Sequence, residues 1–340
     1  MPPLPEGPVR PPPAPLTVDH DRPVLFQAAP AEYFRPLAYL SEDLAALGVD
    51  LRVVHFEDLM MLDDAPAGGT WLMTACDALS PAERIHAAAV ARRLCDGGAR
   101  VLNDPATARD RVQAIRQLHA AGLASYTCWS PAAGERPDRF PVFLRGATGH
   151  RGAREAILDD AAAAEAALAQ ALEEGEVLSD LVFIEFRGAP RRPGHWQKHA
   201  AFRIGDAIVR GLTINDTTWH AKNGALGVAR PEDYAAELAE IDPYPHAEAV
   251  LRVFDALDLE FGRLDFAFVD GRLEPYEVNT APTMRFGFDH PDPDRKEAIA
   301  RMHAAQVEAL AALAARPSGT VRLKGAARRS QANPGHARRF

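Results

Sequence analysis

Cysteine, long apolar runs and positive charge are all scarce in this chain. Its three cysteines, Cys76, Cys95 and Cys128, are too few and too scattered for a disulfide framework or a CxxC metal site. They suit a reducing compartment, so we expect a cytoplasmic protein. No apolar run reaches about 18 residues, the length that a membrane-spanning helix needs. Lys and Arg number 38 against 47 Asp and Glu, a net charge of −9, whereas binding to nucleic acid needs a surplus of cations. We therefore expect neither a membrane nor a nucleic-acid partner.

The two ends of the chain differ in composition from the 340-residue whole. Residues 1–23 contain nine prolines and no apolar h-region, which predicts a disordered leader rather than a signal peptide. Residues 316–340 carry seven Lys or Arg and no acidic residue. This composition predicts a disordered basic tail, and weak binding of an acidic partner is the alternative.

Strand and helix patterns alternate over residues 24–105, which is typical of a parallel sheet covered by helices. The predicted strands are Val24–Ala28, Val49–Phe56, Gly69–Thr74 and Arg100–Asn103, and the predicted helices are Pro36–Leu47 and Pro81–Asp96. Beyond residue 106 we expect helices over Thr107–Ala121, Arg154–Glu174, Pro231–Ile241, His246–Leu257 and Asp294–Ala315, and strands over Phe140–Arg145, Leu181–Phe186, Lys198–Ile204 and Ala207–Thr213.

A hairpin over residues 263–279 carries the clearest chemical signal. Glu277 and Asn279 are two apart on a strand and share one face. A two-residue turn would place Asp265 on the other face, whereas a three-residue turn with a left-handed Gly271 would bring it to theirs. The second register also collects the large apolar side chains on one face, so we predict it. Two carboxylates and an amide oxygen would then converge, a donor set that suits Mg²⁺. A polar, solvated hairpin face is the alternative.

This segment, GRLDFAFVDGRLEPYEVNTAPT, resembles the metal-binding end of the ATP-grasp superfamily of carboxylate–amine or carboxylate–thiol ligases. In that family an Asp on one strand and a Glu-x-Asn on the next hold the Mg²⁺ ions of Mg-ATP. The resemblance covers roughly residues 23–315 and implies an α/β protein with a Rossmann-like N-terminal domain and a two-subdomain ATP-grasp fold of α+β subdomains. The implied boundaries are leader 1–23, Rossmann-like domain 24–105, central subdomain 106–187, C-terminal subdomain with the Mg²⁺ site 188–315 and tail 316–340.

The same resemblance implies roles for residues outside the hairpin. Arg145 stands where the family commonly has a phosphate-binding Lys, and the glycine-bearing loop after it would fold over the triphosphate. Lys198 and Arg203 lie on a strand whose cations face the phosphates, but five residues apart they face opposite sides, and we favour Arg203. The alternative for the glycine-bearing loop is an ordinary surface loop. The alternative for Glu185 and Lys222 is exposure to solvent. The expected site residues are catalytic Arg145, Arg203 and Lys222, nucleotide-binding Arg145, Gly146, Gly149, Gly152, Glu185, Phe186, Lys198 and Arg203, and metal-binding Asp265, Glu277 and Asn279.

The function that this resemblance implies is a Mg-ATP-dependent ligase. It would activate a substrate carboxylate as an acylphosphate, which an amine or similar nucleophile then attacks. The implied cofactors are ATP and Mg²⁺, with Mn²⁺ as an alternative ion, and the implied partners are a small-molecule or peptide carboxylate and an amine-type acceptor. Homodimers are common in the superfamily. Two other functions stay open, a catalytically silent ATP-binding sensor and a metal-dependent enzyme that does not use ATP.

Overall fold

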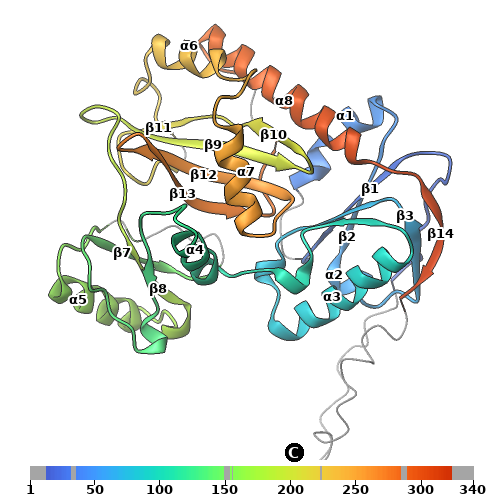
Figure 1. Ribbon diagram of the computed structural model, residues 1–340, viewed down its shortest axis with the longest axis horizontal. Helices are drawn as coiled ribbons and strands as arrows, with labels where there is room; N and C mark the ends of the chain where they lie inside the picture. The colour runs from blue at the N-terminus through green and yellow to red at the C-terminus, as the bar shows by residue number, and fades with distance from the viewer. Residues whose placement is uncertain are drawn as a thin grey trace, which may run out of the picture. The chain divides into compact units, whose positions relative to one another are not determined.

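The structure, a computed structural model, describes residues 13–31, 36–148, 154, 156–222, 224–284 and 289–323 (Figure 1). The chain divides into two units. Unit 1 contains Met1–Thr74, Leu79–Ala106 and Ala314–Phe340, and unit 2 contains Ala75–Ala78 and Thr107–Leu313.

Unit 1 is built around a parallel sheet, as the alternation of strands and helices predicts. Its strands follow the order β2-β1-β4-β5, and every neighbouring pair is parallel. Phe26 of β1 stacks on Trp71 of β4 with ring centroids 4.0 Å apart. The α/β class is confirmed here, and the finer Rossmann-like assignment stays a prediction. The elements are β1 (Val24–Ala29), η1 (Pro36–Leu40), α1 (Ser41–Ala46), β2 (Asp50–His55), α2 (Phe56–Leu59), β4 (Thr70–Met73), α3 (Pro81–Asp96) and β5 (Arg100–Leu102).

The prediction that the tail is disordered from residue 316 is wrong over its first part. β14 (Pro317–Arg322) pairs antiparallel with β3 (Asp64–Gly68), a strand that the sequence pattern does not predict. β3 reads Asp-Ala-Pro-Ala-Gly, a composition poor in strand-forming residues. The pairing with β14, rather than local propensity, therefore accounts for this strand. Residues 324–340 of the predicted tail and residues 1–12 of the predicted leader lie outside the described part of the chain.

Unit 2 contains a small antiparallel sheet with the strand order β6-β8-β7. Every residue of β8 is buried. Leu144 of β7 and Phe183 of β8 form one core with Ala164 and Leu168 of α5. This sheet lies within residues 106–187, the range expected for the central subdomain. Its elements and the segments around it are η3 (Pro105–Thr107), α4 (Arg111–Ala120), β6 (Cys128–Trp129), η4 (Pro131–Ala133), β7 (Val142–Gly146), α5 (Ala161–Glu173), η5 (Leu178–Asp180) and β8 (Leu181–Glu185).

A second antiparallel sheet of unit 2 has the order β10-β9-β12-β13, with β11 also paired to β9. The helix α7 packs on this sheet through Val253 and Phe254, which share a core with Leu264 and Phe266 of β12 (Figure 1). The remaining elements of unit 2 are η2 (Cys76–Ala78), β9 (Trp196–Ile204), β10 (Ala207–Arg210), β11 (Ile214–Asp216), α6 (Pro231–Ala239), α7 (Ala247–Ala256), β12 (Phe261–Val269), β13 (Arg272–Asn279) and α8 (Pro293–Leu313).

Two helices of unit 2 begin later than predicted because an aspartate caps each of them. The side chain of Asp110 accepts a hydrogen bond from Gln113 N at 2.8 Å, so α4 begins at Arg111 rather than Thr107. Asp160 accepts from Ala163 N at 2.8 Å, so α5 begins at Ala161 rather than Arg154. Leu158, just before α5, instead exchanges backbone hydrogen bonds of 2.7 and 2.9 Å with Val142 of β7.

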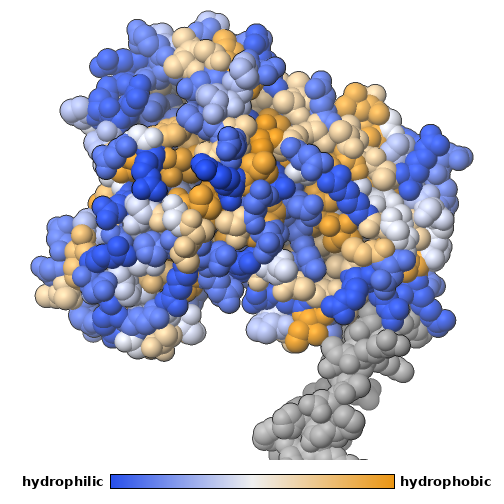
Figure 2. All heavy atoms as spheres, in the orientation of Figure 1, coloured by the Kyte–Doolittle hydropathy of each residue, from blue (hydrophilic) through white to orange (hydrophobic). Residues whose placement is uncertain are grey.

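Among the residues that the structure describes, no helix is both long and apolar enough to cross a membrane. In the view of Figure 2, hydrophobic residues on the visible surface appear in small groups among hydrophilic ones. Scattered apolar side chains of this kind are normal on a protein surface.

Candidate active site

A cavity of about 310 Å³ in unit 2 brings most of the predicted site residues together. It is lined from both sheets of the unit and from the loop that follows β11. Of the predicted residues, the cavity wall includes Arg145, Glu185, Phe186, Lys198, Lys222, Asp265, Glu277 and Asn279. Residues that were not predicted but line the same wall include Tyr126, Phe143, Arg187, Trp196, Trp219, His220, Arg263 and Tyr276.

The β12–β13 hairpin places Asp265 directly opposite Glu277, as the register argument predicts. The predicted three-residue turn, however, is wrong. Val269 pairs with Arg272 across a two-residue turn, in which Asp270 and Gly271 both have positive φ. The register shifts further along the hairpin, between Asp265 and Phe266. Phe266 pairs with Pro275 and Asp265 with Glu277, so Tyr276 is the additional residue of a bulge.

The carboxylate of Asp265 is held by two cations that also line the cavity. Arg263 donates from Nε to Oδ1 at 2.7 Å and from Nη2 to Oδ2 at 3.2 Å. Lys198 Nζ lies 3.2 Å from Oδ2. Asp265 is only 7% exposed, so these ion pairs compensate for most of the cost of burying its charge. Asp265 and its two cations form one charged group on the β9–β12 face of the cavity.

Glu277 is held by two arginines from the other part of unit 2. Arg111 donates from Nη2 to Oε1 at 2.7 Å, and its Nη1 donates to the carbonyl of Gly146 at 2.6 Å. Arg145 Nη2 lies 3.9 Å from Oε2, and Arg145 Nε is buried without a hydrogen-bond partner among the described residues. Burial and, less strongly, the charge of Arg111 lower the pKa of Arg145 to about 10. Arg145 therefore remains protonated at neutral pH, with donor capacity left for an anion.

The predicted metal ligands offer only oxygen atoms, which suit Mg²⁺. Asn279 Oδ1 accepts a hydrogen bond from Ala281 N at 2.9 Å, which fixes the side chain and leaves its second lone pair. Within the described residues, no group of three or more His, Cys, Asp and Glu side chains could hold a metal ion. The two carboxylates and the amide therefore fit an ion that keeps water or phosphate oxygens in the rest of its coordination shell, as Mg²⁺ commonly does.

The preference for Arg203 over Lys198 is corrected by the register of β9. Lys198 lies on the cavity face, whereas Arg203 is absent from the cavity wall. Arg203 Nη1 donates to Asp255 at 2.6 Å and to the carbonyl of Leu259 at 3.0 Å, and Nε donates to the carbonyl of Gly205. The two side chains do face opposite sides of the strand, but the one toward the cavity is Lys198.

Another part of the cavity wall consists of aromatic rings. Trp219 packs against Phe143 and Phe186 with ring centroids 5.0 and 5.3 Å apart, and Phe186 also contacts Trp196 at 6.2 Å. Beside them, Glu185 is 3% exposed and accepts from Arg187 Nη2 at 2.9 Å. The alternative of a solvent-exposed Glu185 is therefore wrong. A flat apolar ring can stack on these aromatic faces.

The glycine-bearing loop can be followed only in part. Gly146 ends β7, where its carbonyl accepts from Arg111, and it is absent from the cavity wall. Thr148 is anchored to Asp180 Oδ1 through its amide at 2.8 Å and its hydroxyl at 2.6 Å. The predicted nucleotide-binding residues Gly149 and Gly152 lie outside the described residues.

Three arginines of the site, Arg111, Arg187 and Arg263, are missing from the sequence-based prediction. Arg263 is two residues before Asp265 on the same strand, so the alternation that groups Glu277 with Asn279 would also have found it. Arg111, by contrast, comes from a distant helix, and no local pattern points from it to Glu277. The cavity wall has five cationic side chains and three carboxylates. The cations are Arg145, Arg187, Lys198, Lys222 and Arg263. The wall therefore favours a polyanion.

Known proteins resemble this chain in structure rather than in sequence. No family model and no curated protein matches the sequence. Among solved structures, the ATP-grasp ligase PsnB complexed with precursor peptide PsnA2 and AMPPNP is 15% identical, with a TM-score of 0.50 over 88% of this chain and 99% of that chain. PsnB with a minimal precursor, Mg and ADP is 14% identical, with a TM-score of 0.50 over 88% and 98%. A RimK domain ATP-grasp protein from Sphaerobacter thermophilus is 19% identical, with a TM-score of 0.49 over 85% and 98%. The similarity to PsnB confirms the ATP-grasp part of the predicted architecture: this chain has the ATP-grasp fold.

Proposed function

We propose that this protein is a Mg-ATP-dependent ligase that joins a substrate carboxylate to an amine or similar nucleophile. The observation that carries the proposal is the pairing of Asp265 with Glu277 inside a cavity with an excess of cations and an aromatic wall. A nucleoside triphosphate has the matching chemistry, because it combines a flat base with a chain of negative charges. The ATP-grasp fold supports the same assignment.

Each part of the cavity has a role in this proposal. The adenine would stack on the aromatic rings of Phe143, Phe186 and Trp219, whose neighbour Glu185 is already neutralised by Arg187. Lys198 and Arg145 would bind phosphate oxygens. Both line the cavity. Arg203, which makes its hydrogen bonds elsewhere, has no role here.

Asp265, Glu277 and Asn279 are the residues that would hold a divalent ion. Their oxygen donors suit Mg²⁺ or Mn²⁺, which would supply neutralisation of phosphate charge when bound. Binding would require the carboxylates to exchange part of their contact with Arg111, Arg263 and Lys198 for the ion. Those cations would then be available to pair with phosphate oxygens.

The chemistry needs no nucleophilic side chain. A substrate carboxylate oxygen would attack the γ-phosphorus of ATP, the bond to the β,γ-bridging oxygen would break, and ADP would leave. The nucleophile would then attack the carbonyl carbon of the acylphosphate, its proton would pass to solvent, and phosphate would leave. Lys222 and Lys198 would offset the charge on the transferred group. PsnB is described with a precursor peptide, so peptide carboxylates belong among the substrates to test, beside small molecules.

Nucleotide-dependent thermal unfolding tests the first half of this proposal. We expect ATP with Mg²⁺ to stabilise the full chain, by about 2.7 kcal/mol at 100 times Kd, and Glu277→Gln to lose most of this increment because the ion loses a charged ligand. Glu248→Gln, on the exposed surface of α7, is the matched control and should keep the increment. A transition that saturating Mg-ATP leaves unmoved in the wild type would reject the proposed function.

Release of ADP tests the second half. A wild-type protein that binds Mg-ATP should release ADP with a carboxylate and an amine present together, and much less with either alone. Binding of Mg-ATP without ADP release across pools of peptide and small-molecule carboxylates would instead support an ATP-binding sensor. Binding of the metal alone, with no strengthening by ATP, would support the enzyme that does not use ATP.

A further inference from the structure

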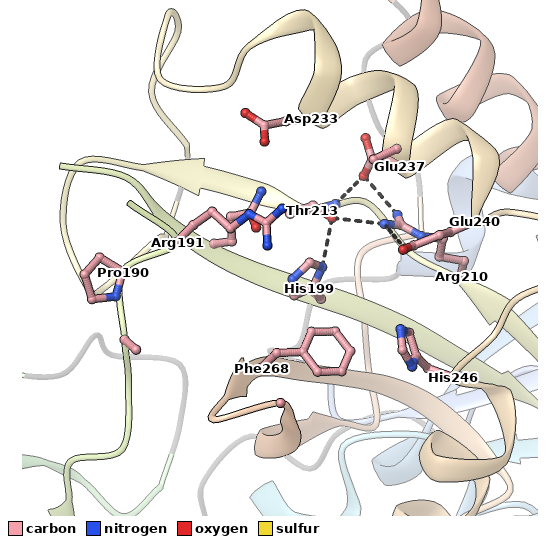
Figure 3. Close-up of a pocket in the computed structure, with 14 residues that line it drawn as sticks. Pro190, Arg191, His199, Arg210, Thr213, Asp233, Glu237, Glu240, His246 and Phe268 are labelled. Atoms are coloured by element: carbon pink, nitrogen blue, oxygen red, sulfur yellow. Dashed lines mark hydrogen bonds and ion pairs between the residues drawn. The ribbon is translucent and has the colours of Figure 1, made fainter. Parts of the chain in front are cut away.

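A second cavity, of about 540 Å³, lies on one face of the β9–β12 strand pair. The cavity described above, which we call the nucleotide cavity for its proposed ligand, lies on the opposite face. Neighbouring residues on each strand divide between the two cavities: Lys198 and Ala267 line the first, and His199 and Phe268 line the second. Its walls are this sheet face, the carboxylates of α6, and the segment from Ala189 to Arg191 (Figure 3). None of the roles proposed above uses this cavity.

Most of the charges around the second cavity are already paired. Glu237 is 3% exposed and accepts from Arg210 Nη1 at 3.0 Å, from Thr213 N at 2.6 Å and from Arg295. Asp233 accepts from Arg192 Nη2 at 2.8 Å. Arg191 also lines the cavity. Its side chain, unlike those above, has no ion pair or hydrogen bond among the described residues.

His199 supplies a donor beside Arg191. Its Nδ1 lies 3.1 Å from Thr213 Oγ1, which already accepts from Arg210 Nη2 at 3.3 Å. Among the described residues the Thr213 hydroxyl has no other acceptor, so its hydrogen points to Nδ1. Burial and the charges of Arg210, His246 and Arg191 lower the pKa of His199 to about 3, so the ring is neutral. The hydrogen-bond network therefore assigns its single proton to Nε2, which has no partner in the described residues.

The remaining wall offers a surface for a flat ring. His246 lies against Phe268 with ring centroids 4.6 Å apart, and His199 meets the same phenyl ring edge-on at 5.3 Å. In Figure 3, Phe268 and His246 lie on the side of the cavity opposite α6, and Arg191 and His199 lie between them and the α6 carboxylates. One unpaired cation, one N–H donor and an aromatic face thus surround the same space.

We propose that this second cavity is a binding site for a small aromatic carboxylate, with the carboxylate on Arg191 and His199 Nε2 and the ring on Phe268 and His246. A guanidinium and a neutral donor suit one carboxylate. Paired groups elsewhere in the lining would remain as they are, so binding would break no existing ion pair.

Occupancy of this site would affect the nucleotide cavity, because Ala189 and Gln197 line both. Gln197 also donates to Asn215 Oδ1 at 3.0 Å, which anchors the start of β9. A ligand on Arg191 therefore orders the same connecting segment that borders the first cavity. The affinities for the carboxylate and for the nucleotide are then linked, and the linkage is reciprocal. This part rests on the proposed nucleotide binding, whereas the carboxylate site itself does not.

Calorimetric titration of the full chain with benzoate, phenylacetate and 3-phenylpropionate tests the site. We expect one of these to bind one-to-one with a Kd on the order of 1 mM, and its neutral amide to bind about tenfold or more weakly. Arg191→Met should weaken the carboxylate by about tenfold. Arg252→Met, an exposed arginine of α7 outside the cavity, should leave it unchanged.

The nucleotide cavity is also cationic and aromatic, so Arg145→Met controls for binding there. Loss of carboxylate binding in Arg145→Met with retention in Arg191→Met would overturn the proposal, as would absence of binding by all three acids. A carboxylate that binds at Arg191 but leaves the Kd of ATP unchanged would retain the site and reject the linkage. Failure of ATP to bind at all would reject the proposed function while leaving the Arg191 titration interpretable.

Discussion

The two cavities of unit 2 share a pair of strands but differ in how their charges are balanced. In the first cavity, five cations face three carboxylates, and Arg145 Nε has no hydrogen-bond partner among the described residues. In the second cavity, the buried carboxylate Glu237 is enclosed by Arg210, Arg295 and the amide of Thr213. The first cavity therefore has cations in excess, whereas in the second the buried carboxylates are already paired and Arg191 is the cation that we propose for ligand binding. Substitution of Lys198 in the first cavity should therefore affect binding, whereas substitution of the paired Glu237 in the second should affect stability.

Glu237→Gln is expected to have the largest effect on stability. The substitution removes the charge that compensates two buried arginines, and breaking a buried pair in this way costs about 3 kcal/mol. Urea unfolding of the variant and of the wild type measures the loss. Glu240→Gln is the matched control, because Glu240 pairs with the same Arg210 at 3.3 Å but its side chain is 42% exposed. It should lose less than about 1 kcal/mol. Equal losses in the two variants would remove the contrast between buried and exposed partners.

Lys198→Met and Arg203→Met compare the two faces of β9 directly. Lys198 lines the nucleotide cavity, so its loss should weaken Mg-ATP binding by about tenfold, or 1.4 kcal/mol. Arg203 contacts Asp255 and the carbonyl of Leu259 on the other face, so its loss should leave the Kd for ATP within about twofold. Calorimetric titration of both variants gives the comparison. The reverse order of effects would restore Arg203 as the phosphate-binding residue.

The hairpin shows how far sequence reasoning reaches. The alternation of apolar residues correctly indicates that one extra residue is needed to bring Asp265 opposite Glu277. Tyr276, which we expected on the apolar face with Phe266, is instead that extra residue and lines the cavity. The same alternation does not say where along the hairpin that residue lies, because a bulge at any position shifts every later pair equally. The turn itself favours two residues, since Asp270 and Gly271 both accept positive φ. The bulge consequently falls at Tyr276, next to the candidate metal ligands.

Long-range contacts set the limit of prediction elsewhere. The alternation of strands and helices predicts that the unit 1 sheet is parallel, whereas β3 and β14 are stabilised by each other across more than two hundred residues of sequence. Arg111 reaches Glu277 in the same way, from a helix 166 positions earlier in the chain. The choice between Lys198 and Arg203 fails for a related reason. Alternation separates the two faces of a strand, but only the pairing of β9 with β12 shows which face meets Asp265.

His199→Gln should have the smallest effect, seen in the pH dependence of stability. His199 has a folded-state pKa of about 3, below the unfolded value of about 6.5, because burial and the charges of Arg210, His246 and Arg191 disfavour its protonation. Between these values the unfolded chain binds the proton and the folded chain does not, so stability is lost as pH falls below about 6.5. Between pH 7 and pH 5.5 this residue should account for about 1 kcal/mol of that loss. Urea unfolding at the two pH values should therefore show a decline that is smaller in His199→Gln by this amount. An equal decline in both proteins would mean that His199 can be protonated in the folded state. The assignment of a neutral His199 ring in the second cavity would then be wrong.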